Sequence, residues 1–324
     1  MRNMLRTPRS FLAVWLAYAL ANMLPVCAAE DSVSLRPKAE DSAPRSALRQ
    51  LLGQSGAATA NREKPPNLYV LAIGVSEYRQ SELRLRFPAK DAQDIAALLR
   101  GQERSLYGAV TARVLTDKDA TRDNILDGLE WLQRQPSPPD VVILFLSGHG
   151  ITDPSTTDYY FLPYDADPQA IKRTMLAQTE FQNSLRHIRG KVLVFLDTCH
   201  AGKVFGTVQT RGLSSVDVFV AELKNAPSGI VVFTSSTSSQ LSLESAEWGN
   251  GAFTRAVLEG LRGRADRDHS GRVTVNMLDL YVSQRVLFLT ARRQSPSTAK
   301  LSTVPDFTIT VVKQLLNEDV QPLR

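Results

Sequence analysis

Four almost entirely apolar runs, each of the length of a β-strand, constrain the fold of this chain more than any other feature. The runs are Leu68–Val75, Asp140–Leu146, Lys191–Leu196 and Ile230–Phe233, and they are rich in β-branched and aromatic residues. A strand without polar alternation is buried on both faces, which is typical of a parallel sheet that helices cover on both sides. The runs therefore predict the core of an α/β domain.

Segments with the spacing of helices separate these runs. Pro88 is placed to begin the first helix, whose apolar residues recur up to Gly101. A short strand at Ala112–Leu115 follows, and Thr121 is a candidate N-cap for a second helix. The alternation predicts a layered α/β fold with a largely parallel sheet, in which chemistry gathers at the carboxyl ends of the strands. Further helices are expected at Glu180–Ile188, Phe253–Leu261 and Val275–Leu289.

The composition excludes several classes of protein. The chain has 324 residues, of which 43% are hydrophobic, and this is enough for a sizeable core. The formal net charge is +5, and three of the basic residues lie in the first nine positions, so bulk charge does not indicate a nucleic-acid-binding protein. With only two cysteines, Cys27 and Cys199, the chain cannot hold a framework of several disulfides or a metal site built on several thiolates.

Residues 1–29 have the pattern of a secretory signal peptide. Three arginines precede the apolar stretch Phe11–Leu24, and small residues follow at Ala28 and Ala29. The uncharged residues 10–29 could instead remain as a membrane anchor, and a lipid anchor on Cys27 is a weaker alternative because Val26 is bulky. Residues 30–66 are rich in Ser, Ala, Pro and charged residues and predict a flexible linker or pro-segment. We therefore expect a periplasmic or secreted protein.

Two polar segments, which we expect to form turns, follow the strands at 140–146 and 191–196. The first contains His149 and the second contains Cys199. If the two strands are neighbours in a parallel sheet, both residues emerge at the same edge, which is the arrangement that a cysteine nucleophile and its imidazole partner require. The amides of Gly150 and Cys199 are candidate donors to the oxyanion of a tetrahedral intermediate. The alternative for Cys199 is a small buried residue at the end of a strand.

Other polar features are weaker indications of a site. The segment 235–239 is rich in hydroxyl groups and leaves a strand at the expected substrate edge, which makes Ser235 a candidate substrate contact. The loop that begins at Asp266 starts like a calcium loop, but its twelfth position is Met277, where a glutamate is needed. We interpret this loop as a surface turn, with calcium binding as the alternative. The four histidines do not have the spacing of metal ligands, so no metal site is expected.

The segments around His149 and Cys199 resemble those of the caspase and metacaspase superfamily of cysteine peptidases. The two residues stand 50 positions apart, and several further segments are similar to the family, in particular to bacterial caspase-like proteins. The resemblance covers residues 67–313 and leaves 314–324 as a C-terminal tail. The further segments are Leu68–Val75 with Tyr78, Lys90–Ala92, Tyr160–Asp165, Ser235–Gln240 with Glu244, Gly251–Thr254, and the stretch from Gln294 to Phe307.

The resemblance implies a caspase-like three-layer sandwich of about six mostly parallel strands with helices on both faces. It implies peptide-bond hydrolysis with Cys199 as nucleophile and His149 as general acid and base, and no cofactor. In the metacaspase branch, acids at the positions of Asp197 and Asp91 line the pocket for a basic P1 side chain. The chain departs from that branch at Phe87-Pro88, where Gly-Cys is usual. It also lacks the paired aspartates of the calcium site, expected between Asp165 and Lys191, and retains Asp165 alone.

We therefore expect an exported cysteine endopeptidase that cuts protein or peptide substrates after Arg or Lys. Alternation along a strand places Asp197 on the same side as Cys199, which favours a pocket for a cation beside the nucleophile. The alternative is a catalytically idle caspase-like module that binds a protein partner, because a fold alone does not establish activity. A calcium-binding regulator is a third hypothesis and rests only on the loop at Asp266. Nucleic acids, and membranes beyond the N-terminal signal, are not expected partners.

Overall fold

The computed structural model describes residues 64–153, 156, 158–200, 220, 229–235 and 242–312, with Cys199 and His200 described by their backbone alone. The chain divides into two units between Arg62 and Glu63, and the second unit contains the helices and strands given below. The predicted signal peptide, most of the predicted linker and the C-terminal tail lie outside the described residues. Among the described residues, no helix combines the length and the apolar character that crossing a membrane requires.

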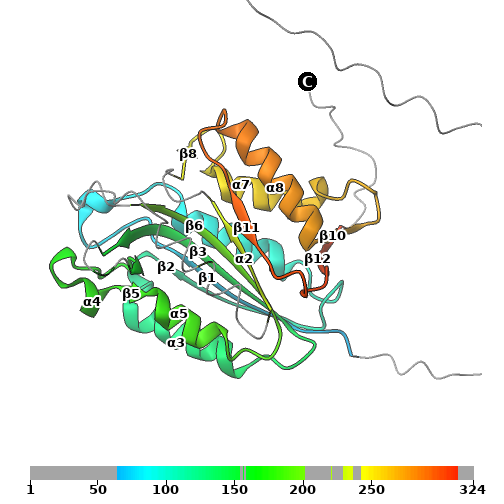
Figure 1. Cartoon of the computed structure of the whole chain (residues 1–324), viewed down its shortest axis with the longest axis horizontal. Coiled ribbons are helices and arrows are strands. Elements are labelled where there is room, and N and C mark those ends of the chain that lie inside the picture. The colour runs from blue at the N-terminus through cyan, green and yellow to red at the C-terminus, as the bar shows by residue number, and fades with distance from the viewer. Residues whose placement is uncertain are drawn as a thin grey trace, which may run out of the picture. The chain divides into compact units, whose positions relative to one another are not determined.

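A mostly parallel sheet forms the centre of the fold (Figure 1). All four apolar runs and the short strand near residue 112 are confirmed as strands of this sheet. Strand β11 is antiparallel to β7. Two short strands extend the sheet at the carboxyl end of β3, where β4 (Tyr159–Phe161) is antiparallel to Gly150–Thr152 and β5 (Leu176–Ala177) is antiparallel to β4. The main strands in spatial order are β11 (Ser297–Ala299), β7 (Ile230–Thr234), β6 (Lys191–His200), β3 (Val141–Thr152), β1 (Leu68–Gly74) and β2 (Val110–Thr116).

Helices cover both faces of the sheet, as the sequence predicts. Figure 1 shows α3 (Arg122–Arg134) and α5 (Gln178–Leu185) on one face, and α2 (Pro88–Arg100), α7 (Ala252–Glu259) and α8 (Val275–Leu289) on the other. Each face has its own buried apolar cluster, and neighbouring residues of one strand belong to different clusters. Successive side chains point to opposite faces of a strand, so a strand between two helical layers needs apolar residues at every position.

Local signals for the helix starts are also confirmed. Pro88 is the first residue of α2, and the hydroxyl of Thr121 accepts a hydrogen bond of 3.3 Å from the amide of Asn124 at the start of α3.

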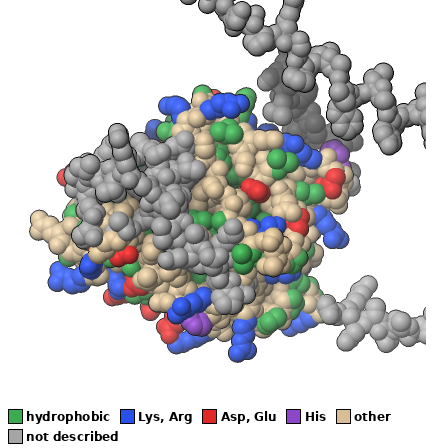
Figure 2. All heavy atoms as spheres, in the orientation of Figure 1, with side chains coloured by type: hydrophobic (Ala, Val, Ile, Leu, Met, Phe, Trp, Pro, Cys, Tyr) green, Lys and Arg blue, Asp and Glu red, His purple; other side chains and the backbone are tan. Residues whose placement is uncertain are grey.

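On the face in Figure 2, Lys and Arg side chains are spread among acidic ones and do not gather in one patch. The shorter elements are η1 (Ser81–Leu83), η2 (Asp117–Asp119), η3 (Pro168–Ala170), α4 (Ile171–Thr174), η5 (Gly260–Arg264), the antiparallel pair β8 (Glu244–Ser245) and β9 (Asn250–Gly251), and the antiparallel pair β10 (Arg272–Thr274) and β12 (Thr308–Val311).

The contact between β1 and α2 gives a test of this packing. A Cβ atom on Gly74 would lie 2.0 Å from the carbonyl oxygen of Pro88, so Gly74→Ala forces the helix start away from the sheet. We expect the free energy of unfolding to fall by about 1–3 kcal/mol, the usual cost of overpacking. Chemical denaturation measures this, with Gly101→Ala as control because Gly101 has ordinary helical backbone angles. Equal stability of the two variants would contradict the packing described.

Candidate functional site

The ends of β3 and β6 bring the two predicted catalytic residues side by side. The parallel register pairs His149 with Cys199, and the backbones of neighbouring strands are about 4.8 Å apart. The polar segments themselves were predicted as turns, and this prediction is wrong: β3 continues to Thr152 and β6 to His200. Polar residues stay in the ladder because backbone groups pair whatever side chain a residue carries.

The imidazole of His149 is buried and held in one tautomer. Its Nε2 lies 2.9 Å from the carbonyl oxygen of Leu83. A carbonyl only accepts hydrogen bonds, so Nε2 carries the proton and Nδ1 has a free lone pair. Nδ1 is fully buried and has no hydrogen-bond partner within the described part of the chain. Burial lowers the pKa of His149, and the bond to Leu83 offsets only part of this effect, so the ring is neutral near pH 7 and ready to accept a proton at Nδ1.

Asp91 and Asp197 lie close together under β9, although 106 positions separate them in the sequence. A Cβ atom on Gly251 would be 2.8 Å from Oδ2 of Asp197 and 3.3 Å from Oδ2 of Asp91. The two side chains therefore meet below a residue that has no side chain of its own. Both aspartates are buried, with 1% and 5% of their surface exposed. The predicted proximity of these two carboxyl groups agrees with the geometry.

Neutral donors hold both carboxyl groups. Asp91 accepts hydrogen bonds from the side-chain amide of Asn250 at 2.7 Å and from the backbone amide of Gly251 at 3.3 Å. Asp197 accepts from the hydroxyls of Thr254 at 2.7 Å and Ser242 at 2.8 Å. Burial, followed by the charge of Asp197, raises the pKa of Asp91 well above its ordinary value, and burial also raises the pKa of Asp197. The pair therefore favours a cation that would join the two groups.

Glu259 is a buried carboxylate whose negative charge is compensated by arginines of the same chain. It accepts hydrogen bonds from the guanidinium groups of Arg255 and Arg285, both at 2.7 Å, and from the hydroxyl of Tyr281 at 2.9 Å. Burial alone would raise the pKa of Glu259, but these bonds outweigh it and lower the pKa to about 2. Among the described residues, no Lys or Arg forms an ion pair with Asp91 or Asp197. Unlike Glu259, these two neighbouring carboxyl groups therefore have no basic partner in the described part of the chain.

Two further residues complete the surroundings of the carboxyl pair. Ser235, the candidate substrate contact, is 1% exposed and lies 2.5 Å from the hydroxyl of Ser242, behind Asp197. Glu244 on β8 accepts from the backbone amides of Arg86 and Phe87 at the start of α2, at 3.2 and 3.4 Å. Burial raises the pKa of Glu244, and the charge of Asp197 adds to this. Sequence reasoning did not place Glu244 beside the pair, although it lies in one of the segments that carry the resemblance.

Gly150, the other candidate oxyanion donor, lies within β3. Its amide points toward β6, because the amide and carbonyl of the preceding residue, His149, both point to the opposite side. Gly150 is in register with His200, and in a parallel ladder such an amide donates to the neighbouring strand. It becomes available to an oxyanion only if β6 diverges there. No side chain fits at this position, since a Cβ atom would be 2.4 Å from the hydroxyl of Tyr159.

The two aspartates that the sequence analysis considered for calcium binding, Asp266 and Asp165, accept hydrogen bonds from backbone amides. The carboxylate of Asp266 accepts hydrogen bonds from the amides of Ser270 and Gly271, both at 2.9 Å, which is the geometry of a surface turn. Asp165 accepts from the amide of Arg122 and so caps the start of α3. Within the described residues, no three His, Cys, Asp or Glu side chains are grouped to hold a metal ion.

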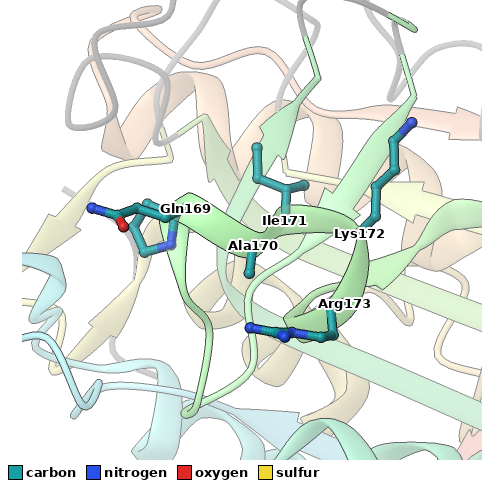
Figure 3. Close-up of a pocket in the computed structure, with 6 residues that line it drawn as sticks. Gln169, Ala170, Ile171, Lys172 and Arg173 are labelled. Atoms are coloured by element: carbon teal, nitrogen blue, oxygen red, sulfur yellow. The ribbon is translucent and has the colours of Figure 1, made fainter.

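A surface hollow of about 350 Å³ lies over η3 and α4 (Figure 3). A single continuous segment lines it, and the side chains of Lys172 and Arg173 diverge from each other. The lining residues include no acid, histidine or cysteine, so we assign no chemistry to it. They are Pro168, Gln169, Ala170, Ile171, Lys172 and Arg173.

Comparison with known proteins gives the relatives of this chain. The sequence model of the caspase domain family matches residues 68–308. A solved structure of protein GSU0716 from Geobacter sulfurreducens is 20% identical, with a TM-score of 0.53 over 74% of this chain and 95% of that one. Caspase-1 from Spodoptera frugiperda is 11% identical, with a TM-score of 0.50 over 80% of this chain and 99% of that one. At these identities the structures show a shared fold. No curated protein matches the sequence.

Removing one charge of the buried pair should stabilise the protein. The ordinary pKa of Asp91 is 3.8 and its pKa in the folded protein is raised, so folding becomes less favourable as the pH rises above about 4. We expect Asp91→Asn to be more stable than the wild type, by an amount that grows between about pH 4 and pH 8. Thermal unfolding across this range measures the difference.

The control for this test is Glu259→Gln. The lowered pKa of Glu259 means that its charge stabilises the fold at neutral pH and ceases to do so as the pH falls toward about 2, so this variant should be less stable than the wild type at pH 7. A stability difference for Asp91→Asn that stays constant or shrinks as the pH rises contradicts the electrostatic account.

Proposed function

Because the chain belongs to the caspase domain family, we propose that it is a cysteine endopeptidase that uses Cys199 and His149 and cuts after Arg or Lys. The observation that carries the proposal is the register of His149 and Cys199 on adjacent parallel strands, where Nδ1 of His149 is buried, unprotonated and without a partner among the described residues. A base with these properties suits the activation of a thiol, because only the thiolate is a strong nucleophile.

The proposed reaction has two stages. First, the thiol of Cys199 gives its proton to Nδ1 of His149, and the sulfur attacks the carbonyl carbon of the scissile peptide bond. In this proposal β6 diverges from β3 at its end, so that the amides of Gly150 and Cys199 can stabilise the oxyanion. The proton then passes from Nδ1 to the nitrogen of the leaving amine as the C–N bond breaks. A water molecule then attacks the thioester and gives its proton to Nδ1. The acid product leaves and the thiol takes its proton back, so no cofactor is consumed.

Asp91 and Asp197 support the proposed specificity. They are two buried carboxyl groups with neutral donors and without a basic partner among the described residues. A substrate guanidinium or ammonium group would supply the missing positive charge. Arg should be preferred to Lys, because the planar guanidinium can bond to both acids at once. The alternative for Asp197, a role limited to local structure, predicts no change in specificity when it is replaced.

Export remains a proposal from the sequence, because residues 1–29 lie outside the described part of the chain. We propose that this segment directs the protein to the periplasm or the outside and is then removed. Fractionation of cells and the N-terminal sequence of the mature protein test it. A mature N-terminus at Met1 in the membrane fraction would support the anchor instead.

We expect Cys199→Ala and His149→Ala each to abolish peptide hydrolysis while the fold is kept, since the two groups act as a unit. The assay is hydrolysis of a peptide with Arg at P1, together with covalent labelling of the protein by a peptidyl-Arg electrophile. His187→Ala is the matched control, because His187 is exposed on the surface and should be dispensable. Full activity of either site variant would remove that residue from the mechanism, and labelling of the Cys199→Ala variant would indicate another nucleophile. A wild type that neither hydrolyses the peptide nor takes the label would favour the idle interaction module.

Replacing Asp197 with Ala should lower kcat/KM for Arg substrates by more than tenfold, because removing one partner of a desolvated charge pair costs about 2–5 kcal/mol. A peptide library randomised at P1 measures the preference of the wild type and the variant. The control is Asp123→Ala, which removes an exposed carboxylate on α3. A wild-type preference for Asp at P1, or an unchanged profile in Asp197→Ala, would reject the specificity.

A further inference from the structure

His149 lies at the point where the neighbour of β3 on one side changes from β1 to β4. Strand β1 pairs with β3 as far as Ser147, and β4 begins its pairing at Gly150. The amide of His149 falls in the gap between them and donates a hydrogen bond of 2.8 Å to the hydroxyl oxygen of Tyr78. A buried amide without an acceptor is costly, so this hydroxyl takes the place of the carbonyl group that a continuous strand would offer.

The chain makes room for this hydroxyl at Gly148. A Cβ atom on Gly148 would lie 2.9 Å from the hydroxyl oxygen of Tyr78, and the φ angle of this residue is +151°, which a side chain would strain. The backbone just before His149 therefore has both the space and the conformation that the close approach of Tyr78 needs.

Tyr78 also contacts the ring of His149. The two ring centroids are 5.3 Å apart and the planes are inclined by 36°. Three contacts therefore hold His149. Tyr78 contacts its backbone amide and one side of its ring, and the carbonyl of Leu83 contacts Nε2. Tyr78 supplies two of these three contacts. Nδ1 is left as the ring nitrogen without a partner among the described residues.

We propose that Tyr78 is a positioning residue, which fixes the backbone and ring of His149 so that Nδ1 is kept available as the base for the thiol of Cys199. This rests on the proposed function for the reaction itself. Tyr78 is not proposed to touch the substrate; its effect on the reaction passes through His149. A small displacement of a catalytic base can cost up to about a hundredfold in rate, so a residue that sets its orientation should affect kcat more than KM.

The first experiment compares Tyr78→Phe with Tyr107→Phe. Each variant keeps its aromatic ring and loses one buried phenol, since the hydroxyl of Tyr107 donates to the carbonyl of Ile309 at 2.9 Å, away from His149. For hydrolysis of a P1-Arg peptide, we expect kcat of Tyr78→Phe to fall by about tenfold or more, with KM within about twofold of the wild type. Tyr107→Phe should keep the wild-type kcat. A retained kcat in Tyr78→Phe, or an equal loss in both variants, overturns the proposal.

The second experiment does not depend on activity. It records the 15N signals of the His149 ring in Cys199→Ala protein, with and without Tyr78→Phe. We expect the neutral tautomer protonated at Nε2 in both proteins, because the carbonyl of Leu83 sets it. When the hydroxyl of Tyr78 is lost and the backbone of His149 is no longer held, we expect the Nδ1 signal to shift or broaden. Unchanged ring signals overturn the proposal, even if kcat falls. If the wild type shows no hydrolysis that depends on Cys199, the proposed function fails, and these ring signals still decide the role of Tyr78.

Discussion

The pairing of β3 with β6 is the constraint on which the rest of the structure depends. Ten consecutive residue pairs join the two strands in parallel, from Val141 with Lys191 to Gly150 with His200. Apolar side chains at successive positions of these strands fill the cores on both faces, so a slip of one residue would exchange the side chains of the two cores. The same register places His149 beside Cys199. The packing of the core and the alignment of the candidate catalytic pair therefore have one physical cause.

Glu259 and the pair Asp91 and Asp197 are buried acids with different surroundings. Glu259 is surrounded by arginines and is charged at low cost, which suits a group that only joins α7 to α8. Asp91 and Asp197 are as deeply buried but have neutral donors, and each makes the charge of the other less favourable. An arrangement that reduces stability in the free protein is expected where a ligand supplies the compensating charge. The contrast within one fold is the strongest electrostatic argument for a cation-binding pocket.

The segment between β1 and α2 connects the two halves of the site. It provides the carbonyl of Leu83 and the hydroxyl of Tyr78 to His149, and the amides of Arg86 and Phe87 to Glu244. Glu244 in turn lies in the field of Asp197. One stretch of about ten residues thus contacts both the candidate base and the acidic group beside the candidate specificity pocket. Its conformation matters for both, because each contact uses backbone atoms or a single hydroxyl.

The sequence alone determined the layered α/β fold, the start of α2 at Pro88 and of α3 after Thr121, because apolar periodicity and caps are local properties. It also indicated His149 and Cys199 as partners. Only the tertiary structure decided that their segments stay in the ladder as strands, that Leu83 fixes the tautomer of His149, and that Asn250 binds Asp91 across 159 positions. These contacts join distant segments through backbone carbonyls and neutral amides, which leave no periodic pattern in a sequence. Their partners are chosen when the whole domain packs.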